Sequence, residues 1–352
     1  MEVFIPALKD GNPFFDEIMF HSKNTFIFDN YKNYSPSYKI VLIHWPEQLF
    51  NWNEPSVDNL KELSAAIKLW KQSSKIIYLV HNQERHYGMT PRYTKLYNLI
   101  EMGCDYMIHF GMYSNTLYKS KYPSIIHKVI PHPLYRESFD IYERNHAREQ
   151  LNIEKNEVVI IAPGSIRNMK ERKMILKSFK NIPIKNKVLI VPRMNWVKFP
   201  FEFKGRILLK KVFDVKKVYE EYVNERKYKS PQYRLGFCFL KNEELSLLMS
   251  AADIVFIPRI KILNSGNVFL GLTYKKIIVA PKVGNVTEVI ESFRLPCFEP
   301  NDSNSIFEAF KKASEMVVSK KSYYIKENLK EFEPPVIAKQ WDNFFMEVAI
   351  EH

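Results

Sequence analysis

Cysteine and long apolar runs are both scarce in this 352-residue chain. Its three cysteines, Cys104, Cys238 and Cys297, are odd in number, widely separated and without a CxxC pair. This pattern excludes a disulfide framework and a zinc knuckle, and it fits a reducing compartment. The chain does not start with a basic segment followed by a long apolar one, and no run approaches the roughly 18 apolar residues of a membrane-spanning helix. We therefore expect a cytoplasmic protein that is neither secreted nor transmembrane.

The positive charge of the chain lies in one segment. The net charge is +13 at pH 7, and residues 166–230 hold 19 Lys and Arg against 6 Asp and Glu. Such a localised basic field attracts phosphate groups, whether on a nucleotide, a nucleic acid or an anionic bilayer. We expect residues 166–230 to serve a nucleotide or to rest on the inner face of an anionic membrane. A solvated, lysine-rich surface is the plain alternative, and no recognised nucleic-acid-binding module accompanies the charge.

Two successive α/β series predict two domains. Strand-like runs at 3–8, 40–43, 75–80, 106–109 and 126–130 alternate with helical patterns, and a second series has strands at 158–162, 188–191, 254–257 and 277–280. This alternation predicts parallel sheets. We place the domains at residues 1–145 and 146–332, divided in the charged stretch after His132. A break at 333–335 and an apolar helix at 337–348 close the chain, and this helix can pack back on the first domain.

A turn and a helix start predict an anion site in the second half. Gly164 follows a strand, and Arg167 and Lys170 come three residues apart at the next helix start, where a guanidinium fork and a mobile ammonium can hold a diphosphate. Residues 264–267, which are Asn264, Ser265, Gly266 and Asn267, follow another strand and open an apolar helix. We expect Asn264 or Ser265 to cap this helix and Gly266 to let an anion approach its free N–H groups. A surface turn and a plain helix cap are the alternatives.

Polar residues also follow the strands of the first half. His81 and Glu84 come directly after a buried strand and are candidates for proton transfer, with His86 in the same turn. The two histidines lie five apart with no third ligand nearby, so no metal site is expected. Another strand is followed by His44, Trp45 and Glu47, where the indole could stack on a sugar ring, and the last strand by His132. Satisfied loop histidines and core packing of Trp45 are the alternatives.

These motifs in this order resemble the GT-B glycosyltransferases, and within them the large group that includes sugar transferases of capsule, exopolysaccharide and lipid-linked glycan assembly. The resemblance spans most of residues 75–290 and is carried by HNQERHYG, IPHPLY, GSIRNMK, SAADIVFIP, NSGNVFLGLTYKKIIVAP and GNVTEVI. It implies two Rossmann-like α/β domains whose parallel sheets face a central cleft, with the acceptor domain first and the nucleotide-sugar domain second. It assigns Arg167 and Lys170 to the donor diphosphate and His81 to the sugar site.

The sequence departs from this group in two places. Many relatives have two glutamates spaced E-x7-E around the donor helix, where this chain has Leu263 and Gly271, so ribose recognition is unassigned. The glycine-rich loop after the first strand is replaced by residues 10–15, although Asn12 still precedes a helix start.

The resemblance implies a hexosyltransferase without a cofactor, and because no DxD-like metal signature stands at a strand end, we expect a metal-independent mechanism. It would move sugar from a GDP- or UDP-linked donor to a hydroxyl of a glycan or lipid-linked acceptor, in surface polysaccharide or glycan biosynthesis. Peripheral attachment to the inner membrane face would fit such an acceptor. The alternatives are a nucleotide-sugar epimerase of similar fold and a non-catalytic glycan-assembly or nucleic-acid-binding protein.

Overall fold

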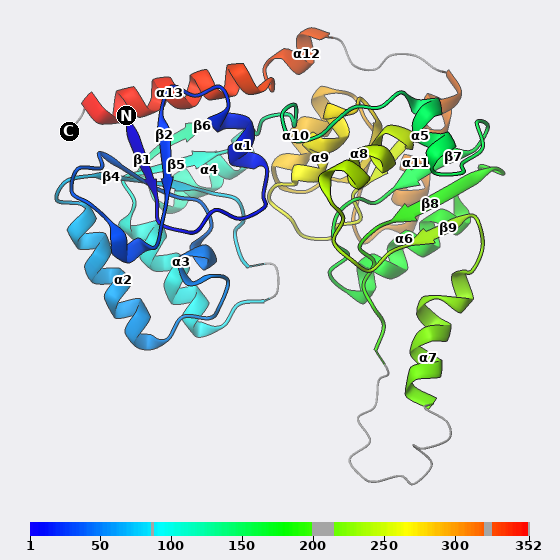
Figure 1. The fold of residues 1–352 in the computed structure, drawn as a ribbon, viewed down its shortest axis with the longest axis horizontal. Helices are drawn as coiled ribbons and strands as arrows, with labels where there is room; N and C mark the ends of the chain where they lie inside the picture. The colour runs from blue at the N-terminus through cyan, green and yellow to red at the C-terminus, as the bar shows by residue number, and fades with distance from the viewer. Residues whose placement is uncertain (86–87, 199–214, 320–325, 351–352) are drawn as a thin grey trace.

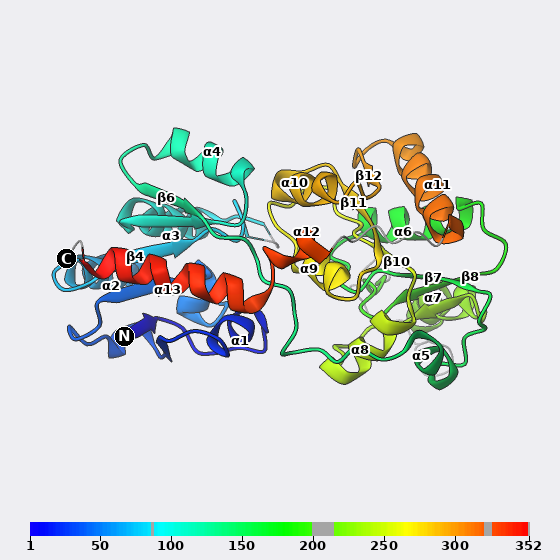
Figure 2. The same ribbon diagram turned by 90° about the horizontal axis from the view of Figure 1, so that it is seen from above.

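The computed structural model describes residues 1–85, 88–198, 215–319 and 326–350. Two α/β units lie side by side, each built on a six-stranded sheet (Figures 1 and 2). The strand orders are β2-β1-β3-β4-β5-β6 and β12-β11-β10-β7-β8-β9, and every neighbouring pair is parallel. The predicted fold class, two α/β halves with parallel sheets, is therefore confirmed.

The strands missed by the sequence patterns all lie at sheet edges. The first sheet contains β1 (Glu2–Ile5), β2 (Thr25–Phe28), β3 (Ile40–Ile43), β4 (Lys75–Leu79), β5 (Tyr106–His109) and β6 (Ile126–Val129). The second contains β7 (Val158–Ile161), β8 (Lys187–Val191), β9 (Tyr233–Leu235), β10 (Ile254–Phe256), β11 (Ile277–Pro281) and β12 (Cys297–Phe298). The missed strands are β2, β9 and β12. Edge strands are often short and partly exposed, so their apolar signal is weak.

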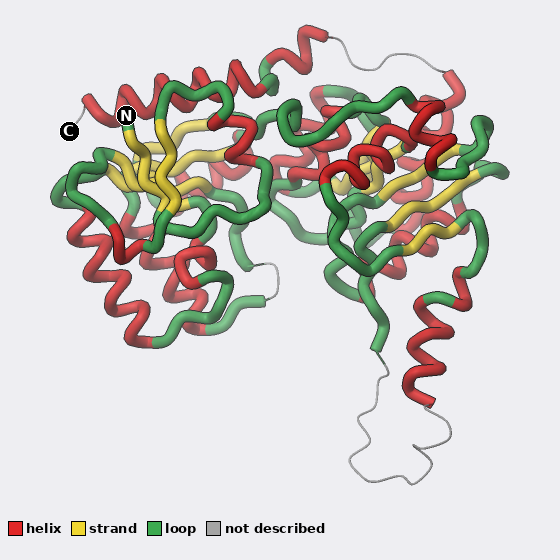
Figure 3. Tube along the Cα trace, in the orientation of Figure 1, coloured by secondary structure: helices red, strands yellow, loops and turns green. Residues whose placement is uncertain are grey.

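Helices cover both faces of each sheet (Figure 3). They are α1 (Phe14–Met19), α2 (Val57–Trp70), α3 (Pro91–Gly103), α4 (Met112–Lys121), α5 (Arg144–Gln150), α6 (Met169–Asn181), α7 (Val215–Asn224), α8 (Asn242–Ala251), α9 (Gly266–Thr273), α10 (Gly284–Ser292), α11 (Ser303–Ser319), α12 (Lys326–Lys330) and α13 (Pro334–Ile350). Residues 334 and 335 start α13 instead of breaking the chain before it. Proline suits the first turn of a helix because the N–H that it lacks has no partner there.

The C-terminal helix α13 packs on the first sheet. Its Trp341 and Phe345 are fully buried in one apolar cluster with Val3 and Ile5 of β1. Its Asp342 also accepts hydrogen bonds from the Ser22 hydroxyl, the Lys23 peptide N–H and the Asn24 amide, at 2.5, 3.0 and 2.7 Å. The chain therefore crosses to the second unit and returns to the first, as Figure 2 shows.

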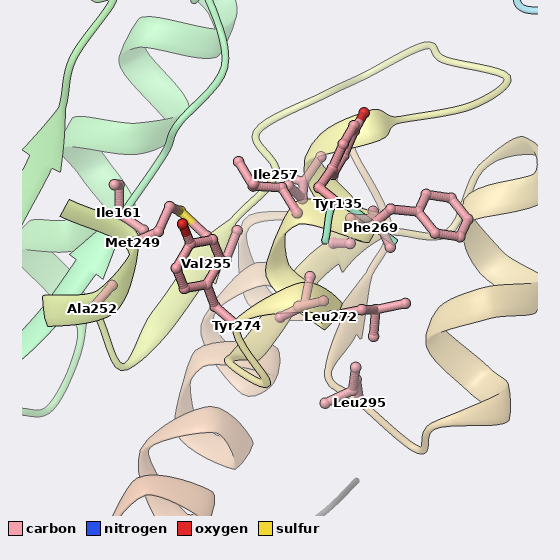
Figure 4. Packing of buried hydrophobic residues seen from close by; sticks show 14 of the residues in the cluster. Tyr135, Ile161, Met249, Ala252, Val255, Ile257, Phe269, Leu272, Tyr274 and Leu295 are labelled. Atoms are coloured by element: carbon pink, nitrogen blue, oxygen red, sulfur yellow. The ribbon is translucent and has the colours of Figure 1, made fainter. Parts of the chain in front are cut away.

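The second sheet buries one side against α6 and α11 and the other against α5, α8, α9 and α10. Alternate residues of β7 make the division: Ile160 belongs to the cluster under α6 and α11, and Val159 and Ile161 to the opposite one. Figure 4 shows part of the latter cluster, including Val255 of β10 and Leu272 of α9. This packing holds the starts of α6 and α9 at the carboxyl edge of the sheet.

Candidate functional site

A cavity of about 610 Å³ opens where the carboxyl edges of the two sheets face each other. We call it the interdomain cavity. The first unit contributes the loop after β1, and the second contributes the turns after β7, β8 and β10 and the start of α9. The charged residues in its wall are Asp10, Arg167, Arg193 and Arg259, and Asn12, Gly266 and Asn267 also line it. Parallel α/β sheets bind ligands at this edge.

Three arginines give the cavity its charge, and Arg259 is the most tightly held of them. Its guanidinium donates to the Glu171 carboxylate at 2.5 Å and to the Ser165 carbonyl at 2.7 Å, and the side chains of Arg259 and Glu171 are 6% and 5% exposed. Glu171 also accepts the peptide N–H of Arg167 at 2.8 Å. One buried carboxylate thus shapes the turn after β7 and fixes a guanidinium beneath it, an arrangement suited to an oxyanion ligand.

The predicted phosphate turn is only partly in the cavity. Gly164 and Arg167 line it, and a Cβ on Gly164 would collide with the Asn267 amide, so the turn packs directly against the start of α9. Lys170 instead lines a separate groove beside α6. Its peptide N–H is capped by the Asn168 side chain at 3.0 Å. The structure therefore separates Lys170 from the other predicted phosphate ligands.

The start of α9 reaches the cavity through Gly266 and Asn267. The predicted side-chain cap is absent, because Ser265 occupies the N-cap position without a side-chain hydrogen bond. Asn264 donates to the carbonyls of Val80 and His81, at 3.2 and 2.7 Å, and so faces the first unit. The Asn264 side chain does not cap the helix because its amide finds acceptors across the boundary between the two units. The first N–H groups of a helix lack partners within the helix, so Gly266 and Asn267 can still present theirs to an anion.

The first unit brings one carboxylate to the cavity, that of Asp10. Its Oδ2 accepts a hydrogen bond from the Gln48 amide at 2.6 Å, and its Oδ1 accepts the Asn12 peptide N–H at 3.0 Å. Asn12 in turn accepts the Phe14 N–H at 3.1 Å, so the expected helix start after residues 12 and 13 is present. Asp10 is the only Asp or Glu in the described wall of this cavity, opposite the arginines.

Three of the four predicted histidines form a buried cluster around Phe14. The ring centroids of His44, His81 and His132 lie 5.6, 5.5 and 5.0 Å from that of Phe14. His44 and His81 stack at 4.2 Å, and Trp45 stacks on His81 at 4.7 Å. Burial lowers the pKa of His44 to about 3 and of His132 to about 4, so both are neutral near pH 7.

His132 connects this cluster to the cavity through Tyr135. Its Nδ1–H donates to the Pro133 carbonyl at 2.7 Å, which leaves Nε2 to accept the Tyr135 hydroxyl at 3.3 Å. Tyr135 lines the cavity, and a Cβ on Gly266 would lie 2.6 Å from its hydroxyl oxygen. None of the three histidines lines the interdomain cavity.

Glu47 and Glu84, two further predicted residues of the first unit, lie in different places. Glu47 is buried, accepts the Tyr97 hydroxyl at 3.0 Å, and has a pKa raised mainly by burial, so it lies away from the cavity. Glu84 is exposed, pairs with Lys261 at 2.9 Å, and lines a second cavity of about 280 Å³ that we call the mouth. His86 lies outside the described residues. Arg167 lines both the mouth and the interdomain cavity, so the two share a wall.

A polar seam fastens the second unit to the first. Asn285 of α10 bonds the Ser114 peptide N–H and hydroxyl, both at 2.9 Å, and the Asn264 side chain at 2.6 Å. Glu288 accepts the peptide N–H groups of Met112, at 2.8 Å, and Tyr113 at the start of α4.

Leu263, beside Asn264 in this seam, and Gly271 occupy the two positions where many relatives have the glutamates of the E-x7-E pattern. Leu263 is 3% exposed and packs within an apolar cluster of the first unit. Gly271 lies under β11, where a Cβ would come 2.8 Å from the Ile278 side chain. Both residues thus pack against apolar neighbours, and neither lines the interdomain cavity.

The basic segment is described in part. Residues 199–214 of the predicted membrane-facing segment lie outside the described residues. Within the described part, no helix combines the length and apolarity that a membrane crossing needs. No cluster of three or more His, Cys, Asp or Glu side chains suited to a metal ion occurs there either.

Sequence reasoning missed Asp10, Arg193, Arg259 and Tyr135. Asp10 and Arg259 come shortly after β1 and β10, where the rule that selected His81 and Glu84 applies equally. The sequence therefore contained a signal for both residues, but a single charged residue after a strand is a weaker indication of a site than several polar residues together. The burial of Arg259 and the contact of Tyr135 with Gly266 depend on the tertiary structure.

No family model matches the sequence, and no curated protein sequence matches it significantly. Solved structures do resemble the fold. Anabaena HepE in complex with UDP-glucose has a TM-score of 0.64 and 14% identity, covering 98% of this chain and 99% of that chain. A glycosyltransferase from Rickettsia africae gives 0.64 and 12%, covering 99% and 98%. Sucrose-phosphate synthase from Thermosynechococcus elongatus gives 0.63 and 14%, covering 90% and 75%. The chain has the two-domain GT-B fold of these glycosyltransferases.

Proposed function

We propose that this protein transfers a hexose from a UDP-linked donor to a hydroxyl group of a glycan or lipid-linked acceptor. One observation carries the proposal: the interdomain cavity brings Arg167, Arg193, Arg259 and the start of α9 together, opposite the carboxylate of Asp10. The choice of UDP is supported by the similar structures, since HepE is described in complex with UDP and with UDP-glucose. Surface polysaccharide assembly is the biosynthetic setting that we propose.

The donor would bind with its diphosphate between the arginines and the start of α9. In the reaction, the acceptor hydroxyl oxygen forms a bond to C1 of the sugar, and the bond from C1 to the diphosphate oxygen breaks with its electron pair. UDP leaves carrying the added negative charge, which fixed guanidinium and peptide N–H groups stabilise without reorganising.

The hydroxyl proton needs an acceptor, and Asp10 is the better candidate among the carboxylates. It lines the cavity from the first unit, whereas Glu84 pairs with Lys261 at the mouth. His81 is 8% exposed and stacks on the rings of His44 and Trp45, which favours a structural role beneath the site. We therefore assign the base role to Asp10 in place of His81 and Glu84.

The proposal is tested by calorimetric titration of the protein with UDP-glucose, GDP-mannose and uridine. Saturable binding of UDP-glucose that exceeds binding of uridine supports the diphosphate site, and equal binding of the two contradicts it. Incubation with UDP-hexoses separates transfer from epimerisation. UDP release that requires an acceptor indicates a transferase, whereas an isomerised donor without UDP release indicates an epimerase.

A further inference from the structure

A groove of about 310 Å³ lies between α6 and α11, beside the predicted donor site and outside it. Its wall is mainly apolar. The apolar side chains that line it are Met174, Ile182, Ile260, Pro300, Ile306, Phe307 and Phe310. Phe310 is buried, whereas Phe307 at the rim is 40% exposed. The groove thus offers a hydrocarbon surface that is open to solvent.

Three lysines run along one edge of this groove. Lys170, Lys173 and Lys177 are spaced i, i+3 and i+7 on α6, so they share one side of the helix. Lys177 donates to the neutral Ser303 hydroxyl at 3.2 Å. No ion pair to any of the three occurs within the described part of the chain, and no carboxylate lines the groove. An apolar groove with an uncompensated row of cations is complementary to an anionic amphiphile.

The groove adjoins the catalytic region through shared side chains. Ile260, which follows β10, lines both the groove and the mouth. Arg167 lines both the mouth and the interdomain cavity. A molecule with its apolar end in the groove could therefore extend its polar end past Ile260 and Arg167 toward the proposed donor.

We propose that the groove binds the hydrocarbon chain of an isoprenyl-phosphate-linked acceptor, with its phosphate on the lysine row and its sugar directed into the mouth. This inference rests on the proposed transferase function, which it deepens by naming the acceptor class. It gives Lys170 a role as a ligand of the acceptor phosphate. It also accounts for the position of the lysine row next to an apolar wall, which a soluble sugar acceptor would not need.

The test uses geranyl phosphate as the probe, titrated calorimetrically into the full-length protein. Geraniol and inorganic phosphate, added separately, report the apolar and the anionic contribution alone. We expect saturable binding of geranyl phosphate and much weaker binding of the other two. Replacing Lys173 and Lys177 together by Gln should weaken binding about 25-fold, at about 1 kcal/mol for each lysine near an anionic lipid group. Phe307→Asp should abolish it.

Lys180→Gln is the matched control, because Lys180 is an exposed lysine of the same helix outside the groove wall. Equal affinities for geranyl phosphate in the wild type and the double variant would overturn the proposal, as would binding no tighter than that of inorganic phosphate. Vesicles of phosphatidylglycerol that displace the probe from the groove would identify a membrane phospholipid as the occupant and also overturn it. UDP-glucose titration of the same proteins is independent, so a failure of donor binding would refute the transferase function separately.

Discussion

Replacing Arg259 by Met should impair both folding stability and donor binding, and the two effects can be separated. The change removes the 2.5 Å partner of Glu171 and leaves a buried carboxylate that still accepts the Arg167 N–H at 2.8 Å. Breaking a buried ion pair in this way costs about 3–5 kcal/mol of unfolding free energy. Adding Glu171→Gln removes the uncompensated charge and keeps an oxygen acceptor for the Arg167 N–H. We therefore expect the double variant to regain most of the lost stability.

Donor affinity should not recover in the double variant. A hydrogen bond to a charged group contributes about 1.5–3 kcal/mol, so the dissociation constant for UDP should rise about 10- to 150-fold. Uridine, which lacks the diphosphate, should bind the double variant and the wild type equally. Urea unfolding measures the stability effect, and calorimetric titration measures the affinities.

Arg172→Met is the matched control, because Arg172 is another buried arginine of this region and donates to the Asn195 and Val223 carbonyls. It does not line the interdomain cavity. We expect it to lower stability without changing UDP affinity. A double variant that binds UDP as tightly as the wild type would refute the assignment of Arg259 to the diphosphate.

Three further outcomes are expected. Asp10→Asn should lower kcat by about 10²-fold or more with little change in the KM for UDP-glucose, because a base acts in the transition state; an unchanged kcat would remove Asp10 from that role. Gly266→Ala should raise the KM for UDP-glucose, since its Cβ would meet the Tyr135 hydroxyl at 2.6 Å and overpacking costs ~1–3 kcal/mol, and Tyr135→Phe should partly restore it; no rescue would contradict the contact. Burial holds the pKa of His44 at about 3 and of His132 at about 4, below the usual value near 6.5. As the pH falls, the unfolded chain therefore binds protons at these histidines before the folded chain does. The free energy of unfolding should fall as the pH drops from about 6.5 to 4, by about 1.4 kcal/mol per pH unit for each histidine. Urea unfolding at several pH values measures this slope, and an equally steep slope in His44→Phe would exclude His44 as a contributor.

The α/β fold was predictable because its signal is local. Strands such as β3, with four consecutive buried residues, are apolar throughout because helices cover both faces of the sheet, and that pattern is visible in a short window. The edge strand β9 is only partly buried along its length, and its apolar content does not distinguish it from a loop.

The site was less predictable because its geometry depends on contacts between distant segments. The sequence correctly indicated that the turn containing Gly164 and the helix start at Gly266 meet, since both follow neighbouring strands of one sheet. It could not show that Asn264 faces the other unit or that Lys170 faces the α6 groove. The directions of these side chains depend on the tertiary packing. A spacing of three residues between Arg167 and Lys170 does not determine whether both side chains face the same cavity.

The seam made by Leu263, Asn264, Asn285 and Glu288 bears on how this protein could be recombined with another. The interdomain cavity is lined by residues of both units, so exchanging one unit with that of another GT-B protein would be an obvious way to alter the site. The loop before α9, however, is anchored by carbonyls of residues 80 and 81, and the start of α4 is anchored by Glu288. A chimera cut at the linker alone would leave both anchors facing foreign partners. A transplantable first unit of this chain would therefore include residues 263, 264, 285 and 288 of the opposite half.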